Sequence, residues 1–120
     1  KGAFDFQKTN TENNNFLFQN VLEKVSGWGS VENTMFVVGA TKANELKKIR
    51  SIVPNHFLLI PGVGAQGGDL NEVVNNGITS DIGLIVNSSR GIIYAGQGED
   101  FDMKSRAAAK EMQQQMAKFL

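Results

Sequence analysis

The sequence predicts an α/β protein built on a parallel sheet. Three apolar runs, at residues 34–39, 57–60 and 81–86, have the composition of strands, and a segment with helical periodicity lies between each pair. Runs that are apolar throughout are typical of strands covered on both faces, as in parallel sheets with right-handed helical crossovers. A glycine-rich turn directly follows the second run and leads into a predicted helix, which gives the repeating strand–turn–helix order.

The spacing of the three strands matches a (β/α) barrel. Their starts near Thr34, Phe57 and Ile82 recur at the pace of that fold. Three parallel strands alone leave two unpaired edges, so either the sheet is completed elsewhere or the fold is a small open one. Barrels frequently hold phosphate with the loops after strands seven and eight. We therefore expect the C-terminal portion of a (β/α)8 TIM barrel, about strands 6–8 with their helices.

Residues 1–33 are predicted to be a loop followed by a helix, within the same single domain as the three βα units of 34–120. The asparagine run at 13–15 favours a loop for residues 1–15, and Phe4 and Phe6 in this loop are expected to pack onto another part of the protein. A helix is predicted by the apolar stripe Phe18, Val21, Leu22 and Val25, and residues 26–29 end it. Trp28, between two glycines, is expected to pack against the protein.

Each βα unit also contains a helix with a recognisable inward face. Thr41 is predicted to cap a helix that residues 54–55 end, with Leu46, Ile49 and Val53 inside. Asp69 is predicted to cap the helix that begins at Leu70 and ends at 75–77, and Pro61 is predicted to end the strand ladder before it. The last helix carries the stripe Ala108, Met112, Met116 and Phe119.

Composition excludes several classes of protein. The 120 residues are 41% hydrophobic, enough for one core, and 12 basic residues balance 12 acidic ones. With net charge +0, no bulk field attracts nucleic acid or an anionic membrane, so neither is an expected partner. The absence of cysteine excludes disulfides and cysteine-based chemistry. Without a long apolar run or a signal-peptide pattern, we expect a cytoplasmic protein.

Two segments at the predicted strand ends are candidates for binding an anion. A strand, a glycine turn and a helix start are suited to phosphate, although the same turn also serves as a purely structural connection. Arg90 follows an apolar strand, where its guanidinium either grips phosphate oxygens or forms a surface ion pair. Ser88, Ser89 and Gly91 would add donors on the same side. Gln66 either reaches a ligand or bonds back across its own loop.

Other polar residues favour structural roles. His56 has no acidic or hydroxyl partner nearby in the sequence, so it is expected in a loop or at the barrel bottom. Asp100 and Asp102 are expected to cap the last helix rather than bind a metal. No Ser/His/Asp set or zinc-ligand spacing occurs, and there is no lysine beside paired aspartates that could act on a bound phosphate ester. The chain therefore has the residues of the binding half of a site.

Three stretches resemble one enzyme family. Residues 36–41, 57–69 and 84–94 are similar to the sixth, seventh and eighth strands of orotidine 5'-phosphate decarboxylase, in its longer bacterial subgroup. Residues 2–7 also resemble the segment after the family's fifth strand. The resemblance implies that the substrate-binding residues are Gly62, Gly64, Ala65, Gln66, Gly67, Ser89, Arg90 and Gly91.

The same resemblance implies a cofactor-free, metal-free lyase that works as a homodimer and converts orotidine 5'-phosphate to uridine 5'-phosphate and carbon dioxide. The family's catalytic Asp-x-Lys-x-x-Asp motif does not occur in this sequence. We therefore expect this chain to be inactive alone and to need the missing N-terminal part of the barrel. Two alternatives remain open: a non-catalytic phosphate- or nucleotide-binding α/β module, and another sugar-phosphate barrel enzyme.

Overall fold

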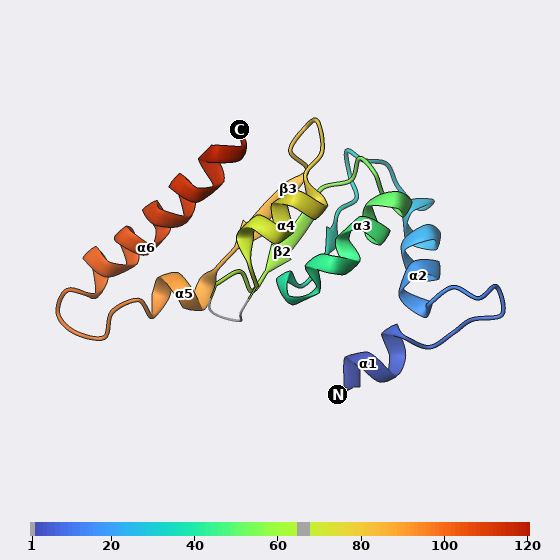
Figure 1. Cartoon of the computed structure of the whole chain (residues 1–120), viewed down its shortest axis with the longest axis horizontal. Helices are drawn as coiled ribbons and strands as arrows, with labels where there is room; N and C mark the ends of the chain where they lie inside the picture. The colour runs from blue at the N-terminus through green and yellow to red at the C-terminus, as the bar shows by residue number, and fades with distance from the viewer. Residues whose placement is uncertain (1, 65–67) are drawn as a thin grey trace.

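Three short strands form one parallel sheet in a computed structural model, which describes residues 2–64 and 68–120. The strands are β1 (Phe36–Val37), β2 (Leu58–Pro61) and β3 (Leu84–Asn87), and they lie in the order β1-β2-β3. Both neighbouring pairs are parallel. The predicted parallel sheet is therefore confirmed, with helices between successive strands (Figure 1).

The strand boundaries differ from the predicted ones. β1 covers only Phe36–Val37 of the predicted residues 34–39, and β2 begins at Leu58 instead of residue 57. Pro61 ends β2 as its last paired residue instead of standing outside it, because it pairs with Asn87 and the next amide, that of Gly62, donates to the Asn87 carbonyl at 3.2 Å. Proline removes only its own N–H, so the pairing continues on the neighbouring residue. β3 begins at Leu84 instead of residue 81, because Ile82 and Gly83 have positive φ angles of 67° and 63° and form a turn.

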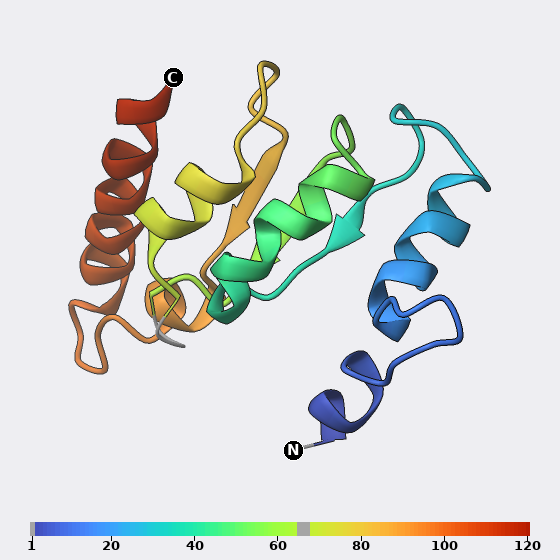
Figure 2. The same ribbon diagram turned by 45° about the vertical axis from the view of Figure 1, so that its right-hand side comes forward.

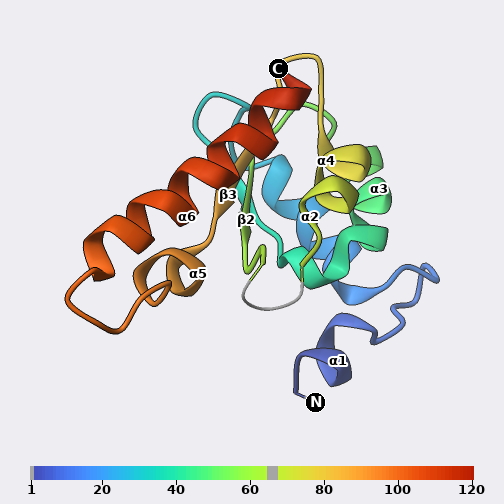
Figure 3. The same cartoon turned by 60° about the vertical axis from the view of Figure 1, so that its left-hand side comes forward.

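Two helices lie together on one side of the sheet, α3 (Ala43–Ile52) and α4 (Leu70–Gly77) (Figure 3). They and the segments next to them bury the apolar residues that the periodicity predicted, namely Leu46, Ile49, Val53, Leu70, Val73 and Val74. Asp69 caps α4 as predicted, since its Oδ1 accepts from the Glu72 amide at 3.0 Å. Thr41 does not cap α3. It lies inside a 3-10 turn, η1 (Ala40–Lys42), which leads into the helix.

The N-terminal segment begins with a helix, α1 (Gly2–Gln7), where a loop was predicted. Thr9 closes this helix, because its hydroxyl donates to the Asp5 carbonyl at 2.8 Å and its amide donates to Phe6. The asparagine-rich stretch after it is a loop, and α2 (Leu17–Ser26) follows as the apolar stripe predicted. α2 lies beyond β1, at the opposite end of the sheet from the last helix (Figure 2).

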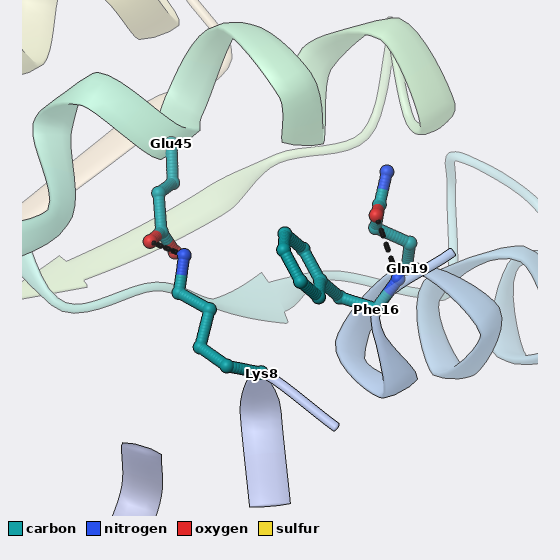
Figure 4. Close-up of polar contacts among 4 residues, drawn as sticks. All are labelled: Lys8, Phe16, Gln19 and Glu45. Carbon is teal, nitrogen blue, oxygen red and sulfur yellow. Dashed lines mark hydrogen bonds and ion pairs between the residues drawn. The ribbon is translucent and has the colours of Figure 1, made fainter. Parts of the chain in front are cut away.

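An ion pair joins the N-terminal segment to α3 (Figure 4). The Lys8 Nζ lies 2.5 Å from a carboxylate oxygen of Glu45, and both side chains are largely shielded from solvent. The same Nζ lies 4.9 Å from the centroid of the Phe16 ring, within range of a cation–π interaction. Gln19 secures the start of α2 by accepting from the Phe16 amide at 3.0 Å. These contacts hold α1 and α2 against the rest of the chain.

The C-terminal part consists of α5 (Ser89–Ile93), α6 (Phe101–Met116) and the 3-10 turn η2 (Ala117–Phe119). The predicted stripe on the last helix packs on the core through Met112, Met116 and Phe119. Asp100 stands before α6 but makes no capping bond. Its carboxylate pairs with Lys104 at 3.0 Å instead, so the capping prediction is wrong there, whereas Asp102 lies in the first turn. Within the described ranges, no helix is long and apolar enough to cross a membrane.

The second face of the sheet is apolar and open. Val37, Leu59 and Ile85 pair across the three strands in one row. Val37 is 67% exposed and Ile85 43%, whereas the alternate residues Phe36, Leu58 and Leu84 are buried under the helices. Such a row would line the interior of a barrel. Two packing predictions are wrong within this chain, since Trp28 is 74% exposed and Phe6 70%.

Arg50 links the segments at the amino-terminal ends of the strands by hydrogen bonds. Its guanidinium donates to four main-chain carbonyls, those of Gly77 (2.6 Å), His56 (2.6 Å), Gly83 (2.8 Å) and Val53 (3.2 Å). Burial lowers the pKa of this guanidinium from its ordinary value. The His56 ring is buried nearby and packs edge-on against Phe36 with centroids 5.4 Å apart. This edge therefore has structural contacts, as predicted for His56, and it lies opposite the candidate site.

Candidate functional site

The carboxyl ends of the strands bring the two predicted binding segments together. β2 ends at Pro61, directly before the glycine turn, and β3 ends at Asn87, directly before the serine–arginine segment. The register pairs Pro61 with Asn87, so the two segments start side by side. Ligands of α/β folds bind at this edge of the sheet.

The glycine turn needs glycine for two different reasons. Gly62 and Gly64 have φ angles of 90° and 76°, in the left-handed region that other residues rarely adopt. Gly68 has no such requirement, but a Cβ placed on it would lie 2.4 Å from the Ala40 Cβ. The Gly64 amide donates to the Gly68 carbonyl at 3.0 Å and closes the turn. Three predicted site residues, Ala65, Gln66 and Gly67, lie outside the described residues.

Ser88 fastens the glycine turn to the end of β3. Its side chain is buried, and its hydroxyl donates to the Val63 carbonyl at 2.9 Å. The expectation that this hydroxyl is a donor for phosphate is therefore wrong, because its single proton is already used by the main chain. The role of Ser88 in this structure is to set the distance between the two binding segments.

Arg90 follows β3 as predicted and lies in the short helix α5. Its side chain is exposed, and no acidic side chain among residues 2–64 and 68–120 pairs with it. Arg90 lines a pocket of about 250 Å³ together with Gly62, Val63, Ser89 and Asn87. None of the described residues that line this pocket is acidic, so its charge suits an anion.

Gly91 belongs to a second pocket, which lies between the glycine turn and α6. This pocket has a volume of about 350 Å³, and Gly64 also lines it. Its walls include the acidic residues Asp69 and Glu111, which would repel a phosphate. Of the predicted residues that the structure describes, Gly62, Ser89 and Arg90 thus share one pocket, whereas Gly64 and Gly91 line its neighbour.

Asn87 is a polar residue of the first pocket that sequence reasoning missed. It is the last residue of β3, and it is exposed. Because successive side chains of a strand point to opposite faces, Asn87 lies on the open face with Ile85, opposite Leu84 and Val86. Its Oδ1 accepts from the Ser89 hydroxyl at 2.9 Å. The signal available in the sequence was a polar residue that follows an apolar run at a strand end.

Comparison with known proteins identifies the relatives of this chain. No family model matches it. Orotidine 5'-phosphate decarboxylase of Bacteroides fragilis is 56% identical over 120 residues, all of this chain and 44% of that protein. The enzyme of the same name from Flavobacterium johnsoniae is 52% identical over 120 residues, again all of this chain and 44% of that protein. The chain is a homologue of orotidine 5'-phosphate decarboxylases along its whole length.

Solved structures agree with this relationship. The UMP synthase of Leishmania donovani superposes with a TM-score of 0.75 at 31% identity, over 94% of this chain and 25% of that one. The OMP decarboxylase of the same organism has a TM-score of 0.72 at 27% identity, over 94% of this chain and 42% of that one. Because these neighbours are TIM barrels, the three-stranded sheet is a portion of such a barrel, as predicted.

The chain spans less than half of the length of the orotidine 5'-phosphate decarboxylases named above. The sequence resemblance seen in the strand and loop motifs is confirmed over the full chain, including residues before the first strand. The Asp-x-Lys-x-x-Asp motif, which the resemblance assigns to catalysis, is not among these 120 residues. The described residues accordingly form a pocket whose charge suits an anion, and they do not include that motif.

Proposed function

We propose that this chain forms the phosphate-binding part of an orotidine 5'-phosphate decarboxylase. In the complete protein, meaning the polypeptide or assembly in which the remaining barrel strands are present, orotidine 5'-phosphate loses carbon dioxide to give uridine 5'-phosphate. The observation that carries this proposal is the identity of 56% and 52% to two enzymes of that name over all 120 residues. No cofactor is required by this proposal.

The pocket supports the phosphate-binding role in particular. Arg90 supplies a guanidinium without an acidic partner among the described residues, and Gly62, with its φ of 90°, lines the same pocket. The proposed substrate-binding set is Gly62, Gly64, Ala65, Gln66, Gly67, Ser89, Arg90 and Gly91. Binding energy from the remote phosphate would lower the barrier at the pyrimidine, where the carboxylate leaves.

The open apolar row supports the need for a barrel partner. Val37, Leu59 and Ile85 would be covered when the remaining strands close the barrel around them. The chain would then be one part of a single barrel domain, with residues 1–33 preceding three βα units at 34–120. We further propose that the complete enzyme is a cytoplasmic homodimer, by analogy with the family that the sequence resembles.

Decarboxylation assays test the proposal. The complete protein should convert orotidine 5'-phosphate to uridine 5'-phosphate with one carbon dioxide released, and residues 1–120 alone should not. Turnover by residues 1–120 alone would contradict the assignment of catalysis to the rest of the barrel. Binding of uridine 5'-phosphate without any turnover by the complete protein would favour the non-catalytic nucleotide-binding alternative.

A substitution tests the phosphate pocket itself. Arg90→Ala should weaken binding of uridine 5'-phosphate to the complete protein by roughly tenfold or more, because a charge-assisted bidentate contact is lost. Arg106→Ala, an exposed arginine on α6, is the matched control and should leave the dissociation constant unchanged. Unchanged affinity in Arg90→Ala, measured by titration calorimetry, would remove Arg90 from the site. Sedimentation of the complete protein tests the homodimer.

A further inference from the structure

We infer that Asn87 is a further phosphate-recognition residue, whose amide group is oriented by Ser89. This inference rests on the proposed function, because it concerns the same anion pocket. Its basis is the position of Asn87 at the end of β3, the contact that its side chain makes, and the charges of the residues around it. The predicted binding set did not include this residue, although it lies within the family-like stretch at residues 84–94.

The first step is the position of the side chain. Asn87 pairs with Pro61 and stands one row beyond Val37, Leu59 and Ile85 on the open face. It is therefore the polar side chain that follows this apolar row, at the carboxyl end of the strands where the site lies. It lines the same pocket of about 250 Å³ as Arg90. A ligand gripped by Arg90 in this pocket would lie within the region that Asn87 borders.

The second step is the orientation of the amide. The Ser89 hydroxyl donates to the Asn87 Oδ1 at 2.9 Å. This bond occupies the carbonyl end of the amide and leaves the Nδ2 end, with its two N–H donors, without a partner among the described residues. An anion accepts hydrogen bonds and cannot donate them, so the Nδ2 end is the one that suits phosphate. Ser89 is thus a positioning residue that turns the donor end of Asn87 outward.

The third step is charge. No acidic residue lies among the described residues that line this pocket, so a phosphate there would meet the Arg90 guanidinium and the Asn87 amide without a repelling carboxylate. Asn87→Asp would place a negative charge at the same position with nearly the same shape. The substitution therefore converts a donor into a repelling group, and distinguishes recognition of the anion from simple packing.

The experiment measures two ligands with the complete protein: uridine 5'-phosphate and uridine, which lacks the phosphate. Asn87→Asp should weaken the binding of uridine 5'-phosphate by at least about tenfold, and Asn87→Ala should weaken it by several-fold. The affinity of both variants for uridine should stay within about twofold of the wild-type value. Ser89→Ala should moderately weaken the binding of uridine 5'-phosphate. Ser89→Thr, which keeps the hydroxyl, should bind it with nearly the wild-type affinity. Asn75→Asp adds the same charge at the far end of α4 and should have no effect.

The possible failures are distinguishable. Variants of Asn87 that bind uridine 5'-phosphate as the wild type does overturn this inference and leave the proposed function intact. An equal loss of affinity for uridine and uridine 5'-phosphate also overturns it, because the residue would then support the site as a whole. A wild-type complete protein that binds neither uridine 5'-phosphate nor inorganic phosphate overturns the proposed function and this inference together.

Discussion

The hydroxyl of Ser88 donates a hydrogen bond to the carbonyl oxygen of Val63 at 2.9 Å, inside the protein and across 25 positions of sequence. This bond joins the glycine turn after β2 to the segment after β3. The two pockets at the carboxyl edge share these two residues as a common wall. The relative position of the two candidate binding segments therefore depends on one buried side-chain contact.

Ser88→Ala should destabilise the complete protein by about 1 kcal/mol, because the buried Val63 carbonyl loses its donor. Urea unfolding measures this change. Ser51→Ala is a matched control, since the Ser51 hydroxyl also donates to a main-chain carbonyl, that of Lys48, but in an exposed position on α3. The control should change the free energy of unfolding by less than about 0.5 kcal/mol. Equal effects of the two substitutions would show that the buried bond has no special importance.

Gly68→Ala should destabilise the protein by about 1–3 kcal/mol through overpacking. The new Cβ would lie 2.4 Å from the Ala40 Cβ and 3.0 Å from the Gly62 carbonyl oxygen, so the glycine turn or η1 must move. Gly39→Ala is the control, because nothing lies within 4 Å of a Cβ there and its φ is −64°. Thermal unfolding compares the two variants. A Gly68→Ala protein as stable as Gly39→Ala would contradict the close approach of Ala40.

Arg50→Ala should lower the free energy of unfolding by about 3 kcal/mol, because four main-chain carbonyls lose a charged donor at once. Arg50→Lys should recover only part of this loss, since a compact ammonium cannot reach acceptors that the planar guanidinium spans. Lys47→Ala, an exposed change on the same helix, should be nearly neutral. Denaturant titration of the three variants checks the order, and a neutral Arg50→Ala would refute the structural role.

Asp69→Ala should destabilise α4 by about 1 kcal/mol, because the helix loses the side-chain acceptor for the Glu72 amide. Asp69→Asn should retain most of the stability, since asparagine caps helices about as well as aspartate. Hydrogen exchange at the first turn of α4 reports the effect locally. Faster exchange of the Glu72 amide in the alanine variant alone is the expected result, and the same rate in both variants would exclude a capping role.

Much of the local structure was predictable from the sequence. The three apolar runs predicted parallel strands, the stripes of α3 and α4 predicted their buried faces, and Asp69 predicted the start of α4. The stripe of α2 predicted the helix, but Val21 in that stripe is 50% exposed. Each of these depends on residues close together in the chain, where periodicity and capping chemistry act directly. The family resemblance likewise followed from contiguous motifs, and similarity over the whole chain confirmed it.

The tertiary structure alone decided how the site is assembled. Sequence gave no reason to pair Pro61 with Asn87, to bond the Ser88 hydroxyl to Val63, or to place Asn87 on the open face. These are contacts between residues far apart in the chain, whose partners are chosen by register and packing. The sequence by itself thus determined a parallel α/β chain related to orotidine 5'-phosphate decarboxylases, because strand and helix patterns are local. Only folding decided which side chains remain available to a ligand, because hydrogen bonds across the sheet use some polar groups and leave others exposed.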